Sequence, residues 1–358
     1  MLYTDDTRIE ALALHLVGNK MKDEPLLLSP GPSTQTGDEE LTRILVAYFL
    51  GGFKGEETYN LFHESDLECN EVYRFACRIF DDAEHFYDHS VALARHLYEA
   101  GGHPQIKGGE FYVVRFSGCR LGGESLDAVG LFKSETRDTY LDVSEQQEGL
   151  HISAFRGINV DRLDKGCLIL ASEREQGFVV RVVDNTNRVE ARYWTDDFLH
   201  VRPRQDNYHN TNNALAMCRS YVTRHLPSEF SVSKADRAEL LNETMNYFRE
   251  QEHFSLDDFS EQVIRQPEVA ESFGRYKASY MDLMVLAYKE EYERERDIRI
   301  EDEFAISDPA VKRQARNYRS VIKLDRNFHI YVHGNTNLLE QGEDERGKYY
   351  KLYYEEEA

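Results

Sequence analysis

Between residues 110 and 184 the chain contains five strand-like runs with no helical pattern between them, and this limits the fold more than any other feature. The runs are rich in Val, Ile, Phe and Leu, and most are bounded by Gly, Asn or Asp: Glu110–Phe116, Leu126–Lys133, Gly149–Phe155, Gly166–Ser172 and Phe178–Asp184. A parallel sheet would need a crossover, usually a helix, between successive strands. The runs therefore predict an antiparallel sheet built from hairpins.

The first hundred residues place further strands and helices in front of this sheet. Ile9–Val17 and Leu26–Ser29 have the composition of two short strands, and Asp38–Tyr48 has the apolar spacing of a helix. Asn70–Ala100 keeps that spacing throughout and predicts one long amphipathic helix, which ends at Gly101. The N-terminal half is therefore expected to combine an antiparallel sheet with a long helix.

The pattern changes to helices after about residue 205. The expected helical segments run from Asn210 to Leu226 with Pro227 ending the segment, from Ser233 to about Gln251, from Ser255 to near Pro267, from Val269 to Arg296, and for a short stretch from Asp308. Ser233 followed by Asp236 has the pattern of a capping box. Three strand candidates end the chain: Val321–Leu324, Phe328–Val332 and Lys348–Tyr354.

These patterns predict an α+β fold in two domains. Residues 1–205 are expected to form an α+β N-terminal domain. Residues 206–358 are expected to form a mainly helical C-terminal domain that ends in a small β element. A length of 358 residues suits two domains of roughly 150 residues each.

Composition also limits where the protein acts. No apolar run approaches the roughly 20 residues needed to cross a bilayer. Asp5 and Asp6 lie where a signal peptide needs basic residues, so a cytoplasmic protein is expected. The five cysteines are scattered, with no C-x-x-C pair, and indicate small buried hydrophobic residues rather than disulfides or a zinc site. We expect no metal and no cofactor.

The overall charge restricts how the chain meets nucleic acid. It carries 65 acidic and 43 basic residues, a formal net charge of −22 at pH 7. This charge argues against a protein coated by DNA over its whole surface, because contact with phosphates needs local positive charge. One confined basic patch is compatible with this charge, and so is a protein that never touches DNA or that mimics it. Composition alone does not decide between these classes.

One basic cluster stands out against this acidic background. Between residues 312 and 326 there are six bases and one acid: Lys312, Arg313, Arg316, Arg319, Lys323 and Arg326, with Asp325. Lys312, Arg316 and Arg319 share one helix face by their spacing, which would present a row of cations to a phosphate backbone. The alternative is pairing with the acidic run 289–303, which holds eight acids and four bases, within the chain or across a dimer.

A second and weaker basic patch lies near the junction of the two halves. It consists of Arg202 and Arg204, with Arg219 and Arg224 further along the chain. Arginines scattered on a surface are common, so this patch is a secondary DNA-binding candidate.

Histidines follow one stripe of the helix predicted over Asn70–Ala100. His85, His89 and His96 align with Asp82 at spacings of three, four and seven residues. Such convergence is what a metal site needs. The apolar face defined by Phe75, Phe86 and other residues lies about a quarter turn away, however, so a half-solvated boundary stripe is the favoured interpretation.

Paired tyrosines mark the C-terminus. Tyr349, Tyr350, Tyr353 and Tyr354 could stack on unpaired bases. Aromatic residues in a strand also form cross-strand pairs and interface anchors, and packing or dimerisation is the favoured role.

The search for catalytic motifs points away from an enzyme. The chain has no G-x-x-x-x-G-K-[ST], no G-x-S-x-G, no H-E-x-x-H, and no G-x-G-x-x-G after a strand. Asp127 and Lys133 lie in one β run as in a nuclease core, but the acid-x-lysine pair of such a core is missing. No catalytic residue is therefore assigned.

Several segments, in order along nearly the whole chain, resemble the bacterial nucleoid-associated protein family of the NdpA type (37-kDa nucleoid-associated protein). They are Leu12–Lys20, Leu27–Ser29, Tyr48–Phe53, Phe62–Leu67, Asn70–Tyr73, Tyr140–Val143, Lys234–Asp236, Tyr247–Phe248, Ile322–Asp325, Phe328–Ile330 and Lys348–Tyr354. Their shared order and spacing carry the resemblance, because none of them is diagnostic alone. The family provides no catalytic motif to place on this chain.

The resemblance implies a bacterial, cytoplasmic protein of the nucleoid that binds DNA with low sequence specificity and without catalysis, with a homodimer as the expected assembly. The alternative is an adaptor or regulator that uses its acidic surface to bind a DNA-processing enzyme such as a topoisomerase. A metal-dependent nuclease is the third hypothesis.

Overall fold

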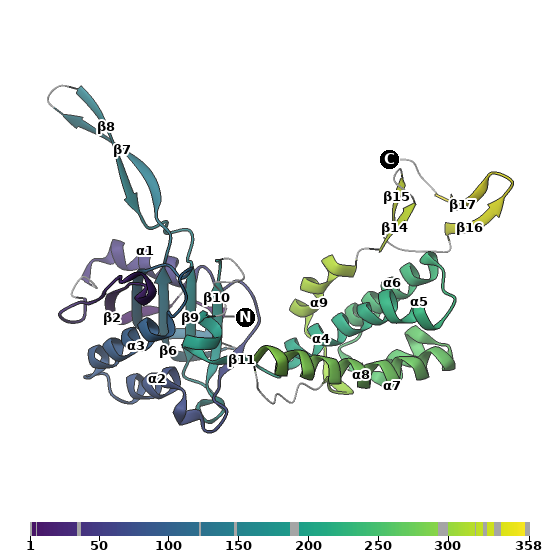
Figure 1. Cartoon of the computed structure of the whole chain (residues 1–358), viewed down its shortest axis with the longest axis horizontal. Helices are drawn as coiled ribbons and strands as arrows, with labels where there is room; N and C mark the ends of the chain where they lie inside the picture. Colours follow the sequence, from purple (N-terminus) through teal and green to yellow (C-terminus); the bar gives the residue numbers. More distant parts are fainter. Residues whose placement is uncertain are drawn as a thin grey trace. The chain divides into compact units, whose positions relative to one another are not determined.

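A computed structural model gives the structure of the chain over residues 2–4, 6–33, 37–121, 123–146, 149–186, 193–292, 300–318, 320–324, 328–332 and 338–354. Residues 1–204 and residues 205–358 form separate compact units, here called unit 1 and unit 2. The predicted α+β class is confirmed, with a large antiparallel sheet in unit 1 and a small β element at the C-terminal end of unit 2 (Figure 1).

The centre of unit 1 is an antiparallel sheet in the order β11-β4-β10-β9-β6-β5-β2-β3, with β1 paired to β5. The strands are β1 (Leu2–Tyr3), β2 (Arg8–Val17), β3 (Leu26–Leu28), β4 (Tyr59–Leu61), β5 (Gly109–Leu121), β6 (Glu124–Ser134), β9 (Lys165–Leu170), β10 (Val179–Asp184) and β11 (Val201–Pro203). All six residues of β9 are buried, because helices cover the middle of the sheet on both faces.

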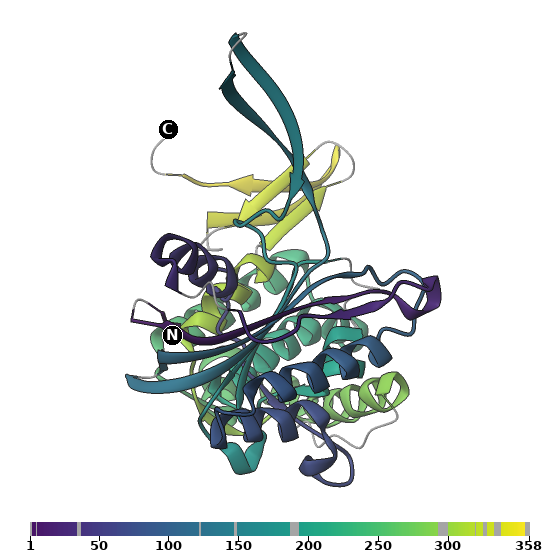
Figure 2. The ribbon, with the colours of Figure 1, turned by 90° about the vertical axis from the view of Figure 1, so that its left-hand side faces the viewer.

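Helices cover the two faces of this sheet unequally (Figure 2). The helix α1 (Glu39–Leu50) lies on one face, where Phe49 stacks on Phe132 of β6 at 4.4 Å between ring centroids. Its N-cap is Asp38, whose side chain accepts a hydrogen bond from the backbone N–H of Leu41. The helices α2 (Glu71–Asp81) and α3 (Phe86–Ala100) pack on the other face. Short helical turns fill the loops of unit 1: Lys20–Lys22, Leu67–Cys69, Arg174–Gln176 and the π-helical Tyr193–Leu199.

The single helix expected over Asn70–Ala100 is in fact two helices, and the expectation of continuity was wrong at Asp82. Asp82 has an extended backbone, and its carboxylate accepts hydrogen bonds from the backbone N–H of Glu84 at 2.9 Å and from Nδ1 of His85 at 2.6 Å. A short polar side chain that binds the backbone just after itself competes with the helical hydrogen bonds. The break allows α2 and α3 to pack against each other on the sheet.

Two strands leave the sheet and form a separate hairpin, here called the arm. The arm consists of β7 (Asp138–Gln146) and β8 (Gly149–Gly157), paired from Asp138 opposite Gly157 to Gln146 opposite Gly149. It projects away from the body of unit 1 (Figures 1 and 2). Gly149–Phe155 is thus a strand as predicted, but it belongs to the arm and not to the large sheet.

Unit 2 is built from helices around a second core. They are α4 (Asn207–Ser220), α5 (Leu226–Glu229), α6 (Lys234–Glu250), α7 (Leu256–Phe259), α8 (Pro267–Tyr292) and α9 (Asp308–Ala315), with the π-helical turns Tyr221–His225 and Ser260–Ile264 and the 3-10 turn Arg316–Tyr318. The capping box predicted at Ser233 and Asp236 is confirmed. Pro227 and Pro267, expected to end helices, instead lie in the first turns of α5 and α8, where a missing N–H costs nothing.

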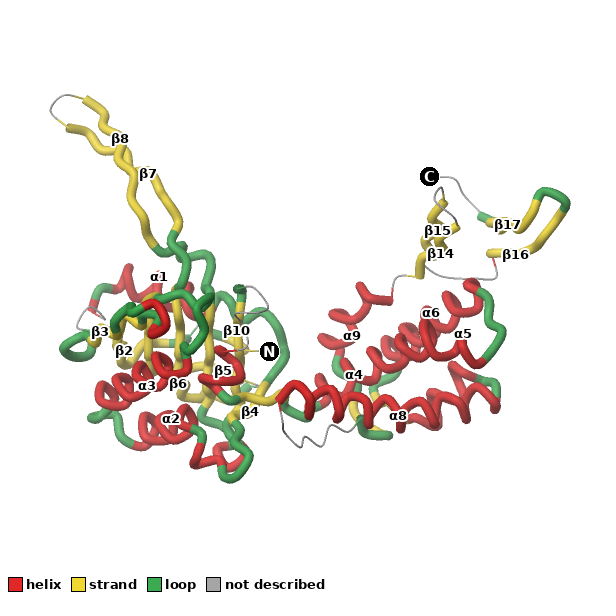
Figure 3. Tube along the Cα trace, in the orientation of Figure 1, coloured by secondary structure: helices red, strands yellow, loops and turns green. Residues whose placement is uncertain are grey.

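The β elements of unit 2 are all two-stranded (Figure 3). In the helical core, β12 (His253–Ser255) pairs with β13 (Glu303–Ala305). At the C-terminal end, β14 (Ser320–Leu324) pairs with β15 (Phe328–Val332), and β16 (Leu339–Asp344) pairs with β17 (Gly347–Leu352). The three C-terminal strands predicted from sequence are present, and β16 is an additional one. Residues 325–327 lie outside the described part of the chain. No helix in the described ranges is long and apolar enough to cross a membrane.

Candidate nucleic-acid interface

The helix α9 and the turn after it hold the described members of the basic cluster. The buried side of α9 consists of Ala310, Val311 and Gln314, because Pro309 in the first turn and this apolar spacing direct one face toward α4 and α6. Lys312, Arg313 and Arg316 are exposed and are here called the α9 cations. Arg319 and Arg326 lie outside the described residues, and the side chain of Lys323 on β14 is likewise not described.

Hydrogen bonds to α4 fix the position of these cations. Arg313 donates from its guanidinium to the hydroxyl of Tyr208 at 2.8 Å. Gln314 donates from Nε2 to Oδ1 of Asn212 at 2.6 Å, and Tyr318 donates to the backbone carbonyl of Leu215. The α9 cations are therefore presented on a helix with a fixed orientation within unit 2.

The alternative for this cluster was pairing with the acidic run 289–303. Within the described residues, Asp302 of that run pairs with Lys277 on α8, while neither Lys312 nor Arg316 forms an ion pair. Residues 293–299 lie outside the described part of the chain, so pairing with them is not tested. Asp302 is thus paired away from the basic cluster.

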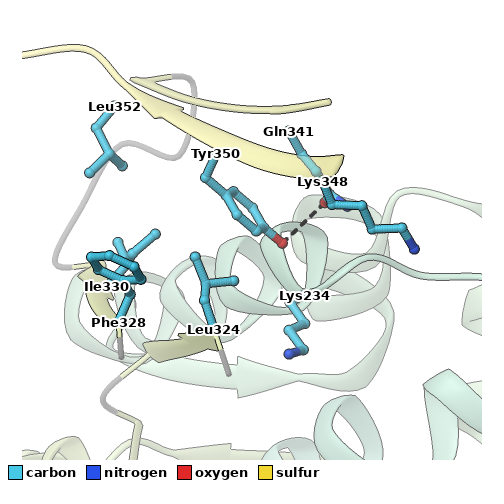
Figure 4. A pocket seen from close by; sticks show the side chains of 8 residues that line it. All are labelled: Lys234, Leu324, Phe328, Ile330, Gln341, Lys348, Tyr350 and Leu352. Carbon is cyan, nitrogen blue, oxygen red and sulfur yellow. Dashed lines mark hydrogen bonds between the residues drawn. The ribbon is translucent and has the colours of Figure 1, made fainter. Parts of the chain in front are cut away.

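A cavity of about 750 Å³ lies in unit 2, between the start of α6 and the two C-terminal hairpins (Figure 4). Its lining is Lys234, Leu324, Phe328, Ile330, Gln341, Lys348, Tyr350 and Leu352. Tyr350 donates from its hydroxyl to Oε1 of Gln341 at 3.2 Å, which holds its ring in the cavity wall. The cavity therefore combines aromatic and aliphatic walls with two lysines.

Sequence reasoning missed this cavity as a candidate site. Lys234 and Lys348 come from a helix start and a hairpin far apart in the chain, and neither lies in a basic run. Of the tyrosines singled out at the C-terminus, Tyr350 lines the cavity, Tyr353 donates to Glu340 at 2.5 Å, and Tyr349 lies under the ammonium of Lys351. The only signal in the sequence was the alternation of apolar residues in Phe328–Val332.

The comparison with family models covers almost the entire chain: the model described as Nucleoid-associated protein YejK matches residues 13–348. The chain belongs to this family. Comparisons with curated proteins and with solved structures give no match. Membership implies a role in the organisation of the bacterial nucleoid, as the resemblance had indicated. The matched range contains α9 and the cavity residues up to Lys348.

The second basic patch is occupied by local contacts in unit 1. The guanidinium of Arg202 lies 4.4 Å from the ring centroid of Phe62, and burial lowers its pKa. Arg204 pairs with Glu173 at 2.6 Å. Arg219 and Arg224 are exposed but belong to unit 2. Arg202 and Arg204 thus have structural contacts that the sequence did not reveal.

The three histidines on the predicted stripe make three unrelated contacts. His85 pairs with Asp82, and this hydrogen bond raises the pKa of His85. His89 packs on Phe75, and burial lowers its pKa. His96 places Nε2 at 2.9 Å from the carbonyl of Phe198. Within the described residues, no group of three metal-ligating side chains is present.

The residues considered for a nuclease core serve other purposes. Asp127 lies 3.6 Å from Arg115, while Lys133 is buried six residues further along β6. Lys133 donates to the carbonyl of Lys107 at 2.7 Å, to Oε1 of Glu135 at 2.9 Å and to Tyr193 at 3.0 Å. Burial lowers its pKa, and the charge of Glu135 opposes that change.

A second buried lysine lies beside it. Lys165 is the cross-strand neighbour of Lys133 and donates to Asp184 at 2.8 Å and to Thr186 at 2.7 Å. The ring of Tyr193 lies about 5 Å from both ammonium groups, at 5.1 Å and 5.0 Å. We call Lys133 and Lys165 the lysine pair. Each of its members has its own carboxylate partner within unit 1.

Proposed function

We propose that the chain binds DNA with low sequence specificity and without catalysis, and that this binding is its part in nucleoid organisation. The observation that carries the proposal is the row of exposed α9 cations on a helix fixed by hydrogen bonds to α4. Cations on a rigid helix reach successive phosphates, and contacts to phosphates carry no direct sequence information. Low specificity follows from that chemistry.

The proposed surface extends beyond α9. Arg319, Lys323 and Arg326 continue the cluster along the chain, and Lys234 and Lys348 add two cations at the cavity. Phe328 and Tyr350 would offer aromatic faces to a base or sugar beside those lysines. Arg202 and Arg204, held by Phe62 and Glu173, are left out of the surface.

The acidic remainder of the chain shapes this binding. A net charge of −22 repels DNA from most of the molecule and favours a single docking face. Binding through phosphate contacts weakens as salt rises, because each counterion released from the DNA gains less entropy when the solution already contains more salt. We further propose a cytoplasmic homodimer, which would present two such faces to one DNA molecule and raise the apparent affinity.

Charge reversal on α9 tests the surface. Lys312→Glu with Arg316→Glu removes two cations that have no hydrogen bond to α4, so the fold should be preserved. Affinity for a labelled duplex is expected to fall at least about tenfold, and the slope of log affinity against log salt should decrease by about 2. Titrations at several salt concentrations measure both quantities.

A matched control separates the surface from the overall charge. Arg43→Glu with Lys54→Glu makes the same change in net charge on exposed residues of unit 1. This control should retain most of the affinity. Equal losses in both variants would contradict the α9 assignment. If the wild-type chain shows no affinity for DNA and instead co-purifies with a DNA-processing enzyme such as a topoisomerase, the adaptor function replaces DNA binding.

A further inference from the structure

The arm carries an apolar face that no described residue of unit 1 covers. One face of β7 and β8 carries the apolar set Leu141, Val143, Leu150, Ile152 and Ala154. The other face carries Asp142, Ser144, His151 and Ser153, with the stacked pair Tyr140 and Phe155 toward the root of the arm. The exposed fraction is 70% for Leu141, 59% for Val143, 79% for Leu150 and 65% for Ile152. Val143 and Ile152 lie directly opposite each other in the middle of this face.

A bare hairpin of this kind needs a partner surface. Two isolated strands are at best marginally stable in water, and contiguous exposed apolar patches mark interaction sites.

The root of the arm is nevertheless well anchored. Asp164 is buried and accepts hydrogen bonds from the backbone N–H groups of Glu135 at 2.7 Å and Thr136 at 2.8 Å. Asn159 donates to Asp138 at 2.9 Å. The arm is therefore held in place to meet another molecule.

The charge of the arm excludes nucleic acid as its partner. Asp138, Asp142 and Glu145 are its described acids, against Arg156 as its one described base. Backbone phosphates would be repelled by this excess of acid. The partner has to offer an apolar surface, with a cation beside it for Glu145, which lies on the apolar face directly opposite Leu150.

Unit 1 itself contains such a surface. Leu14 and Leu16 on β2 and Leu27 on β3 lie on one face of the sheet, and Leu16 is directly opposite Leu27. They expose 39%, 40% and 54% of their surface, and we call them the apolar strip. Exposed Lys22 and Lys107 line one cavity together with Leu16. The other charged residues of that cavity are Arg137, Arg156, Glu24, Glu110 and Glu135, so its lining has four bases and three acids. Within the described residues, β3 is also the last strand of the sheet on this side, so its outer edge is available for backbone pairing.

We propose that the arm of one copy of this chain docks on the apolar strip of a second copy, and that the second copy returns the same contact. The arm projects away from its own sheet (Figures 1 and 2), which leaves it open to contact with another chain. Two identical contacts close a twofold dimer without further growth. Arm and strip together expose on the order of 800 Å² per copy, the usual contribution to a stable interface. This assignment rests on the homodimer of the proposed function and names its contact.

Two pairs of substitutions on adjacent rungs of the arm test the assignment. Val143→Lys with Ile152→Lys adds two charges to the apolar face, and Ser144→Lys with His151→Lys adds the same charges to the opposite face one rung away. Sedimentation should show a dimer for the wild-type chain and the Ser144/His151 variant. For the Val143/Ile152 variant we expect the dissociation constant of the dimer to be at least about a hundredfold higher. Circular dichroism verifies that both variants remain folded.

Each outcome is decisive. A Val143/Ile152 variant that stays dimeric overturns the arm assignment and leaves the homodimer standing. A monomeric wild-type chain overturns both, while DNA binding is judged separately by the α9 variants. If both lysine variants dissociate, the assignment to one face is overturned.

A disulfide between copies tests the strip. In a Cys69→Ser background, which removes the exposed cysteine, a chain with Leu27→Cys is mixed with a chain with Ile152→Cys. A disulfide between the two chains is expected, and Ser144→Cys in place of Ile152→Cys should give much less. Equal yields, or no disulfide in either mixture, would overturn the apolar strip as the docking surface.

Discussion

At the residue scale, His15 on β2 is a buried imidazole with only one of its two nitrogens in contact with a polar group. Its Nε2 lies 3.1 Å from Oγ of Ser90, and Ser90 donates to the carbonyl of Tyr87, so Nε2 carries the hydrogen. Within the described residues Nδ1 has no hydrogen-bond partner. Burial lowers the pKa of His15 to about 4. A neutral imidazole is therefore part of the folded state at neutral pH.

This predicts a specific loss of stability in acid. The unfolded chain binds a proton at His15 below pH 6.5, whereas the folded chain does so only below about pH 4. The free energy of unfolding should therefore fall as pH drops from 6.5 toward 4 and level off below that. Between pH 7 and pH 4.5 the wild-type chain is expected to lose roughly 2–3 kcal/mol more than His15→Gln. Denaturant unfolding at both pH values measures the difference, and equal losses would contradict it.

Residues like His15 and Asn70 show what the sequence could and could not predict at this scale. Both lie in segments that carried the family resemblance, but their contacts could not be inferred. Asn70 accepts from the N–H of Tyr73, a local capping contact, and donates to the carbonyls of Phe62 at 2.9 Å and Leu199 at 3.0 Å. The contact to Leu199 spans 129 residues, a distance at which composition and spacing carry no information.

At the element scale, the sequence predicted the helices and strands that depend on neighbouring residues, but not the strands that depend on a partner far away in the chain. The capping box of α6 depends on residues three apart, and the strands β5, β6, β9 and β10 depend on runs of β-forming residues. Both kinds were predicted. The strands β4 and β11 have only three residues each and form because they pair with each other. The strand β16, Leu339–Asp344, is rich in Glu, Gln and Asp, and the low β propensity of these residues argued against a strand.

The arm gives a prediction at the element scale. Asp164→Ala removes the acceptor for the N–H groups of Glu135 and Thr136, so the root of the arm should loosen. Amide exchange in Asp138–Gln146 and Gly149–Gly157 is expected to accelerate at least about tenfold, because local opening becomes easier. Hydrogen exchange followed by mass spectrometry measures this. Asp161→Ala, in the same loop but exposed, is the control and should leave the rate unchanged.

At the scale of the whole molecule, the basic cluster was visible in the sequence but the cavity was not. Lys312, Arg313 and Arg316 are close in the chain, so a local count of charges finds them. The cavity needs α6, β15 and β17 to meet, which only the fold of unit 2 provides. The orientation of α9 also depends on Tyr208 and Asn212, about a hundred residues earlier.

The domains proposed from sequence, residues 1–205 and 206–358, lead to a prediction about unfolding. The chain has a single tryptophan, Trp194, which is fully buried in unit 1, so its fluorescence follows that unit alone. A chain ending at residue 205 and a chain starting at residue 206 should each fold, because each unit has its own core. Thermal melts of each piece, followed by circular dichroism, should match one transition of the full chain within a few degrees. A piece that shows no cooperative transition would contradict the division.

The lysine pair has a consequence for how this sequence can change over time. Lys133 and Glu135 are both almost fully buried, and so is Lys165 beside Asp184. Losing one partner leaves a charge stranded in the interior, which costs about 3–5 kcal/mol, whereas exchanging both partners for apolar residues can be neutral. Each of these ion pairs can therefore be lost without a large cost in stability only when both of its residues are replaced together. The interior of unit 1 thus contains two pairs of residues that are expected to be replaced together during evolution, whereas exposed positions can be replaced one at a time.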